Sequence, residues 1–127
     1  MNEKPVLSII MATHNNGVLA SDAIMSVINN MPRNCELLVI NDGSTDESDQ
    51  LIRDLVHTYS HIRYYYQSKS GVSVARNRGI ALSRGDYLAF IDGDDLYSDN
   101  FFRVIMPVLE KQQYDIIAYE STRDHNI

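Results

Sequence analysis

Short apolar runs alternate along the chain with longer segments whose apolar residues recur three and four positions apart. The short runs are rich in branched side chains and predict strands at 6–12, 36–41, 62–66, 86–91 and 114–119. The longer segments predict helices at 18–31, 45–59, 71–83 and 101–111. Ser44 or Thr45 would cap the second helix, with Glu47 near a capping-box position. This alternation favours right-handed crossovers and a doubly wound, mostly parallel α/β sheet.

Size and composition fit a single domain over residues 1–127. The formal net charge of -6 argues against a nucleic-acid binder. The single cysteine, Cys35, excludes an internal disulfide and is expected to be a small core residue beside a strand. The N-terminus lacks signal-peptide features, and no apolar run approaches the ~20 residues of a transmembrane helix. We therefore expect a cytoplasmic protein, and attachment to the inner face of a membrane stays compatible with the sequence.

Polar, turn-forming sequences follow three of the predicted strands. They are THNNG at 13–17, NDGSTD at 41–46 and DGDD at 92–95. Ligands of open α/β sheets bind outside the carboxyl ends of the strands. The three turns therefore predict one shared pocket.

The sharpest feature of that pocket is the DGDD turn. Asp92 and Asp94 are two residues apart and can face the same point, while Gly93 lets the backbone turn and a ligand approach. Two carboxylates about 4 Å apart repel by about 4 kcal/mol at an effective dielectric constant of about 20. A proton, a buried arginine or a metal ion would offset that repulsion, and an oxygen-only set suits Mg²⁺ or Mn²⁺. An acidic turn, or a helix start at Asp99, is an equally good interpretation of these residues alone.

Other polar residues near the three turns have two interpretations each. Asp42 could accept hydrogen bonds from a ribose or base, or could serve as a turn or cap residue. Lys69, Arg76 and Arg78 are the nearest cations; the two arginines could grip a phosphate, neutralise the acidic turn, or be ordinary surface residues. His14 follows the first strand, where its ring could lie against a nucleobase.

Three segments together resemble the N-terminal half of family 2 glycosyltransferases, which have the GT-A fold. They are VLSIIMATHNN at 6–16, ELLVINDGSTDES at 36–48 and SGVSVARNRGIALSRGDYLAFIDGDD at 70–95. The resemblance implies inverting transfer of a sugar from a nucleoside-diphosphate sugar to an acceptor hydroxyl. The donor would most often be a UDP-sugar. The acceptor would be a carbohydrate or a lipid-linked glycan in polysaccharide or glycoconjugate synthesis.

The resemblance also implies roles for individual residues. Asp92 and Asp94 match the family's DxD motif, with Asp92 near the ribose and Asp94 on the Mn²⁺ or Mg²⁺ ion, and Asp95 is an additional acid at the metal. The implied nucleotide-sugar site comprises Ala12, Thr13, His14, Asn15, Asp42, Arg76, Asp92 and Gly93.

The chain departs from the family pattern in two respects. The family usually has Pro-Thr-Tyr-Asn at 12–15, so His14 replaces an aromatic residue that packs on the base, and the identity of the base stays open. The family's general base is an acid in the acceptor-binding half, and this chain ends at Ile127, before that half. No carboxylate here matches the base, and no catalytic base is assigned.

The principal alternative is a non-catalytic module of similar fold, such as a phosphorylatable receiver domain or another nucleotide-binding α/β domain. A receiver needs acids after its first strand, where this chain has Thr13 and His14. It also needs a lysine after the fifth strand, where this chain has Glu120.

We expect the 127-residue chain to bind a sugar donor but to transfer sugar weakly or not at all, because no general base matches the family pattern. The measurement is sugar transfer to an acceptor by the purified chain. Robust transfer would contradict this expectation.

Overall fold

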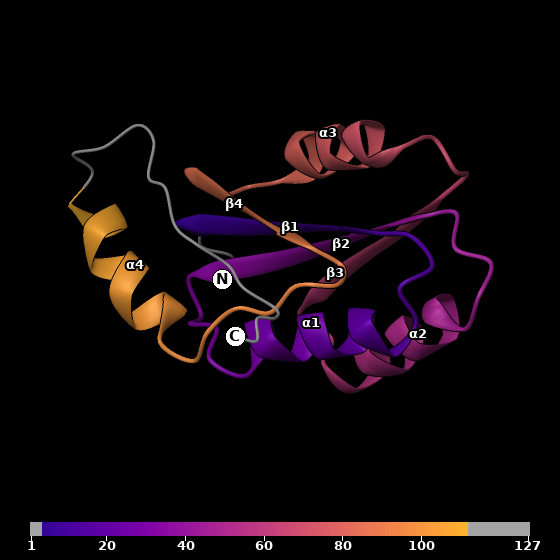
Figure 1. Cartoon of the computed structure of the whole chain (residues 1–127). Helices are drawn as coiled ribbons and strands as arrows, with labels where there is room; N and C mark the ends of the chain where they lie inside the picture. Colours follow the sequence, from indigo (N-terminus) through magenta and orange to yellow (C-terminus); the bar gives the residue numbers. More distant parts are fainter. Residues whose placement is uncertain (1–3, 112–127) are drawn as a thin grey trace.

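The computed structural model describes residues 4–111, which fold into a parallel sheet with helices on both faces (Figure 1). The sheet order is β3-β2-β1-β4, and each neighbouring pair is parallel. The elements are β1 (Leu7–Thr13), α1 (Val18–Ile28), β2 (Cys35–Asp42), α2 (Ser48–Thr58), β3 (Ile62–Gln67), α3 (Val72–Leu82), β4 (Tyr87–Asp92) and α4 (Phe101–Glu110). The doubly wound, parallel α/β prediction is confirmed. The strand predicted at 114–119 lies outside the described residues.

Two helix boundaries differ from the sequence prediction by three residues. Helix α2 begins at Ser48 and has no side-chain cap, so the prediction of a Ser44 or Thr45 cap was wrong. The Ser44 hydroxyl instead accepts a hydrogen bond from the backbone N–H of Asn15, which commits it to the neighbouring loop. Helix α1 ends at Ile28, three residues earlier than predicted. Within residues 4–111, no helix is both long and apolar enough to cross a bilayer.

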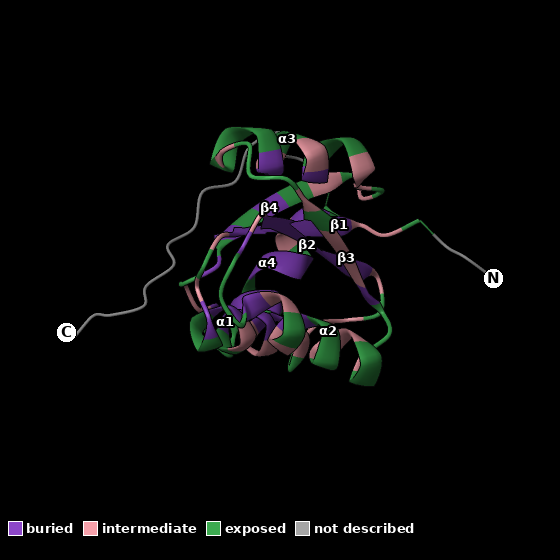
Figure 2. Ribbon diagram, turned by 90° about the vertical axis from the view of Figure 1, so that its right-hand side faces the viewer, coloured by how far each residue is buried: buried purple, intermediate pink, exposed green. Residues whose placement is uncertain are grey.

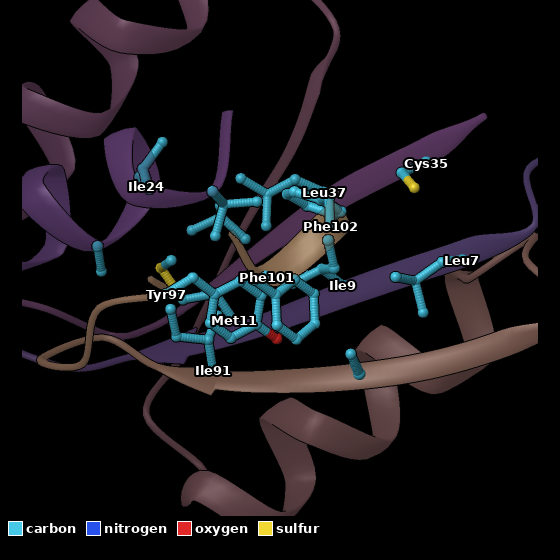
Figure 3. Packing of buried hydrophobic residues seen from close by; sticks show 14 of the residues in the cluster. Leu7, Ile9, Met11, Ile24, Cys35, Leu37, Ile91, Tyr97, Phe101 and Phe102 are labelled. Atoms are coloured by element: carbon cyan, nitrogen blue, oxygen red, sulfur yellow. The ribbon is translucent and has the colours of Figure 1, made fainter. Parts of the chain in front are cut away.

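The larger hydrophobic core lies on the sheet face covered by α1, α2 and α4. All residues of β1 and β2 are buried, as expected for central strands covered on both faces. Around Met11 and Ile91 the core is closed by aromatic rings that follow β4, with Tyr97 stacked on Phe101 at a centroid distance of 4.0 Å (Figure 3). Cys35 is buried in this core, as predicted. This packing fixes β4 and the turn that follows it against the sheet.

Helix α3 covers the opposite face of the sheet, and burial there is less extensive (Figure 2). Its buried residues are Ala75 and Gly79, with Ala75 packed against Ala12 and Ile40. Gly79 lies so close to β1 that a Cβ atom there would be 2.4 Å from Cγ2 of Ile10. The small residue lets α3 approach the sheet closely, which sets the height of the helix above the strand ends.

We expect Gly79→Ala to lower the free energy of unfolding by about 1–3 kcal/mol, because the added methyl group overpacks the contact with the buried Ile10. This loss should exceed the roughly 1 kcal/mol that alanine gains over glycine in a helix. Urea unfolding measures the change. Asn77→Ala, at an exposed position of the same helix, is the control and should not destabilise the protein. A Gly79→Ala variant as stable as the wild type would contradict the close contact.

Candidate nucleotide-sugar site

The carboxyl ends of β1, β2 and β4 meet at one edge of the sheet. Parallel pairing places Thr13 beside Asn41 and Ala12 beside Asp92. The loops that leave these strands surround a cleft of about 470 Å³. Its lining residues are Ala12, Thr13, His14, Asn16, Asp42, Lys69, Gly71, Val72, Arg76, Asp92, Gly93 and Asp94. The lining therefore includes eight of the ten residues that the family resemblance assigns to the nucleotide-sugar and metal sites, and leaves out Asn15 and Asp95.

Asn15 ties two loops together at the rim of the cleft. Its backbone has a positive φ of 52°, and its side-chain Oδ1 accepts hydrogen bonds from the N–H groups of Thr45 and Asp46. Asn16 is the asparagine that lines the cleft, where its Oδ1 accepts a hydrogen bond of 2.6 Å from the Thr13 hydroxyl. Neighbouring residues in a tight turn point in different directions, and the sequence alone did not show which asparagine turns inward.

The ring of His14 is held at the cleft wall by contacts with Asp42 and Asn15. Nδ1 lies 2.7 Å from the carbonyl oxygen of Asp42. A carbonyl oxygen can only accept, so Nδ1 carries the proton. The side-chain amide of Asn15 lies 3.3 Å from Nε2 and can donate to it. These two contacts fix the orientation of the ring at the predicted base-binding position.

The Asp42 carboxylate organises the segment that leads into α3. It accepts hydrogen bonds from Nε2 of Gln67 and from the backbone N–H groups of Ser70 and Gly71, all at 2.8–2.9 Å. Burial alone would raise the pKa of this carboxyl, but the hydrogen bonds hold it below its ordinary value. Asp42 is thus ionised at neutral pH. It fixes the loop that carries Lys69 and the start of α3.

Gly43, which follows Asp42, lets the end of β2 lie close to the backbone of Lys69. Gly43 has a φ of 71°, and a Cβ atom there would lie 2.6 Å from the backbone nitrogen of Lys69. A side chain at this position would be strained and would also collide with backbone. The Asp42–Gly43 pair therefore sets the distance between the ends of β2 and β3.

Asp92, Asp94 and Asp95, hereafter the acidic trio, form one group of carboxylates beside the cleft. One oxygen from each lies within 4.8 Å of the others. Nη2 of Arg76 lies 2.6 Å from Oδ1 of Asp92, in an ion pair whose side chains are 40% and 50% exposed. Such exposed pairs contribute roughly 0–1 kcal/mol. The repulsion expected from the sequence is thus offset in part by an arginine, and the arginine remains open to solvent.

Gly93 allows the acidic trio to approach β1. A Cβ atom there would lie 2.4 Å from both Thr13 Oγ1 and Asn16 Oδ1. Its backbone N–H donates to the carbonyl of Ala12 at 3.1 Å, which continues the β1–β4 pairing past Asp92. Only glycine fits this position without moving the loop of β1.

Three of the residues that line the cleft were not predicted from the sequence. Arg78 was also counted among the nearest cations, although this residue is not part of the lining. Asn16, Gly71 and Val72 line the cleft, the last two because Asp42 draws the start of α3 towards β2. That contact pairs residues 29 positions apart, and a local pattern does not reveal it. Arg78 does not line the cleft, and its guanidinium lies 5.4 Å from the ring centroid of Tyr65.

Comparisons with known proteins identify the family to which the chain belongs. The sequence matches the family described as glycosyl transferase family 2 over residues 8–124, and the chain belongs to that family. It is 34% identical over 116 residues to the uncharacterized glycosyltransferase YibD of Escherichia coli, which covers 91% of this chain. The chain spans 34% of the length of that relative.

Two solved structures resemble the fold. S. aureus TarS 1-349 in complex with UDP-GlcNAc superposes with a TM-score of 0.75 at 21% identity, over 84% of this chain and 31% of TarS. The mannosyltransferase PcManGT of Pyrobaculum calidifontis, in complex with GDP-Man and Mn²⁺, gives 0.67 at 20% identity, over 78% of this chain and 30% of that protein. At these identities the likeness establishes the fold, which is of the GT-A type.

We expect Asp42→Asn to lower the free energy of unfolding at pH 7 by about 1.5–3 kcal/mol, because an amide cannot accept both backbone N–H groups as a carboxylate does. The wild-type carboxyl has a pKa below that of the unfolded chain, which is about 3.9. Its contribution is therefore complete above about pH 5 and is lost as the pH falls through the folded-state pKa. Urea unfolding between pH 7 and pH 3 should show the gap between the two proteins narrowing below about pH 4. A gap independent of pH would contradict this role.

Proposed function

We propose that this chain forms the donor-binding part of a glycosyltransferase, and that its cleft holds a nucleoside-diphosphate sugar, most often a UDP-sugar, through a divalent metal ion. The observation that carries the proposal is that Asp42 and the Asp92–Asp94 pair open into the same cleft. Membership of glycosyl transferase family 2 supports the activity. The complexes of TarS with UDP-GlcNAc and of PcManGT with GDP-Man support the class of ligand.

The acidic trio fits a hard divalent ion such as Mn²⁺ or Mg²⁺. Its donors are carboxylate oxygens only, they lie within 4.8 Å of one another, and they are at least partly open to water. Such ions take one or two carboxylates and complete their coordination with water and phosphate oxygens. Asp94 and Asp92 would hold the ion, with Asp95 as an additional acid. The Mn²⁺ in the PcManGT complex supports a divalent metal ion as the class of cofactor.

The nucleoside would occupy the side of the cleft formed by β1 and β2. The segment from Ala12 to His14 supplies the wall for the base, and the oriented ring of His14 offers a flat surface. Asn15 would act from the rim by holding His14 and the loop at 45–46. A carboxylate has about four lone-pair sites, and three donors of the protein contact Asp42. About one acceptor site therefore remains for a ribose hydroxyl or a base N–H.

The diphosphate would lie between the acidic trio and α3. Lys69 and Arg76 line this part of the cleft, and the first turn of α3 carries no side-chain cap. A guanidinium, an ammonium and a helix N-terminus all favour a phosphate group. Gly93 lets the acidic turn lie against Thr13 and Asn16, at the same edge of the cleft.

The proposed reaction is a single displacement with inversion at the anomeric carbon. A bound metal ion supplies neutralisation of the charge that develops on the departing diphosphate. The acceptor hydroxyl would belong to a carbohydrate or a lipid-linked glycan and would need a general base to take its proton. None of the residues described here is assigned that role. A cytoplasmic location, with or without attachment to the inner membrane face, remains part of the proposal.

We predict that Asp94→Ala weakens UDP binding in the presence of Mn²⁺ by on the order of 10- to 100-fold, because the variant loses a direct metal ligand. Isothermal titration of UDP with and without Mn²⁺ measures the effect, and the unfolding temperature without ligand should stay within a few degrees of the wild type.

Asp99→Ala is the matched control. Asp99 lies in the same acidic segment of the sequence, but it lines a separate surface hollow beside α4. The Asp99→Ala variant should bind UDP and Mn²⁺ like the wild type. Equal affinity of Asp94→Ala and Asp99→Ala for UDP with Mn²⁺ would contradict the metal role of Asp94.

A further inference from the structure

The ion pair between Arg76 and Asp92 connects the proposed diphosphate position, beside α3, with the proposed cation position, at the acidic trio. Arg76 belongs to α3, beside the proposed diphosphate position, and Asp92 is the last residue of β4 and a member of the acidic trio. Both side chains line the cleft, and they are 40% and 50% exposed. An exposed pair of this kind is weak and exchanges readily with water or with another charged partner.

A divalent cation and the Arg76 guanidinium would compete for the same carboxylate. Nη2 of Arg76 lies 2.6 Å from Oδ1 of Asp92, so a cation bound there would face a positive charge at close range. Because like charges repel, Asp92 does not readily bind the cation and the Arg76 guanidinium at the same time. A diphosphate offers Arg76 two or more anionic oxygens and a better geometry for a bidentate guanidinium contact.

We infer that Arg76 couples the two ligands of the site. Without nucleotide, Arg76 neutralises Asp92 and lowers the affinity of the acidic trio for the divalent cation. A nucleoside diphosphate draws the guanidinium from Asp92 to its phosphates and thereby raises the affinity of the acidic trio for the cation. This inference rests on the proposed function, and it adds that nucleotide and metal bind cooperatively through one arginine. Coupling of this kind is reciprocal, so the metal raises the affinity for the nucleotide by the same factor.

The test compares Arg76→Gln with Arg78→Gln. Both variants remove one positive charge from α3. Arg78 lies outside the cleft, where it contacts Gln67 at 3.3 Å and the ring of Tyr65. The EPR signal of free Mn²⁺, followed during titration of each protein with and without UDP, gives the dissociation constant of the cation. Thermal unfolding without ligands checks that both variants fold.

We expect Arg76→Gln to bind Mn²⁺ about two- to fivefold more tightly than the wild type when no UDP is present, because its competitor for Asp92 is removed. The enhancement of Mn²⁺ affinity by UDP should shrink by at least the same factor, while UDP itself binds more weakly. Arg78→Gln should resemble the wild type, apart from a small uniform gain from its changed charge.

Two failures can be told apart. If the wild type binds Mn²⁺ neither with nor without UDP, the proposed function is wrong and the coupling is wrong with it. If the wild type binds both ligands, but Arg76→Gln shows the same Mn²⁺ affinity and the same enhancement by UDP as Arg78→Gln, the coupling through Arg76 is overturned and the donor site stands.

Discussion

The parallel pairing of β1 with both β2 and β4 is the constraint on which the site depends. It places the ends of three strands, separated by tens of residues in the sequence, along one edge of the sheet. The pairing is maintained from both sides, by the large core under α1, α2 and α4 and by the close approach of Gly79 to Ile10. Because the strands are buried, their register cannot slip without exposing apolar side chains. The cleft is therefore a consequence of the fold.

The loops at this edge are held by two kinds of interaction. On the β2 side, partly buried hydrogen bonds of Asp42 and the paired contacts of Asn15 fix the backbone before any ligand arrives. On the β4 side, the exposed ion pair between Arg76 and Asp92 can exchange partners at little cost. A rigid wall beside an adaptable charged edge suits a ligand with a flat base at one end and a diphosphate at the other.

Much of this arrangement could be predicted from the sequence, and the failures share a cause. Periodicity located the strands and helices among the described residues, because burial on one or both faces dictates that pattern. The cap of α2 was predicted wrongly because the Ser44 hydroxyl bonds Asn15, 29 residues away. The same limit applies to Asp42, whose carboxylate lines the cleft and accepts hydrogen bonds from the N–H groups of residues 70 and 71, far along the chain. Side-chain contacts between distant loops leave no local signature.

A crystal structure of the chain grown with UDP and Mn²⁺, with diffraction recorded where manganese scatters anomalously, would test the proposed donor site. We expect one anomalous peak bonded to carboxylate oxygens of Asp92 or Asp94 and to phosphate oxygens, with the nucleoside beside His14 and Asp42. A nucleotide bound elsewhere on the molecule, or bound in the cleft with no manganese at the acidic trio, would contradict the proposal.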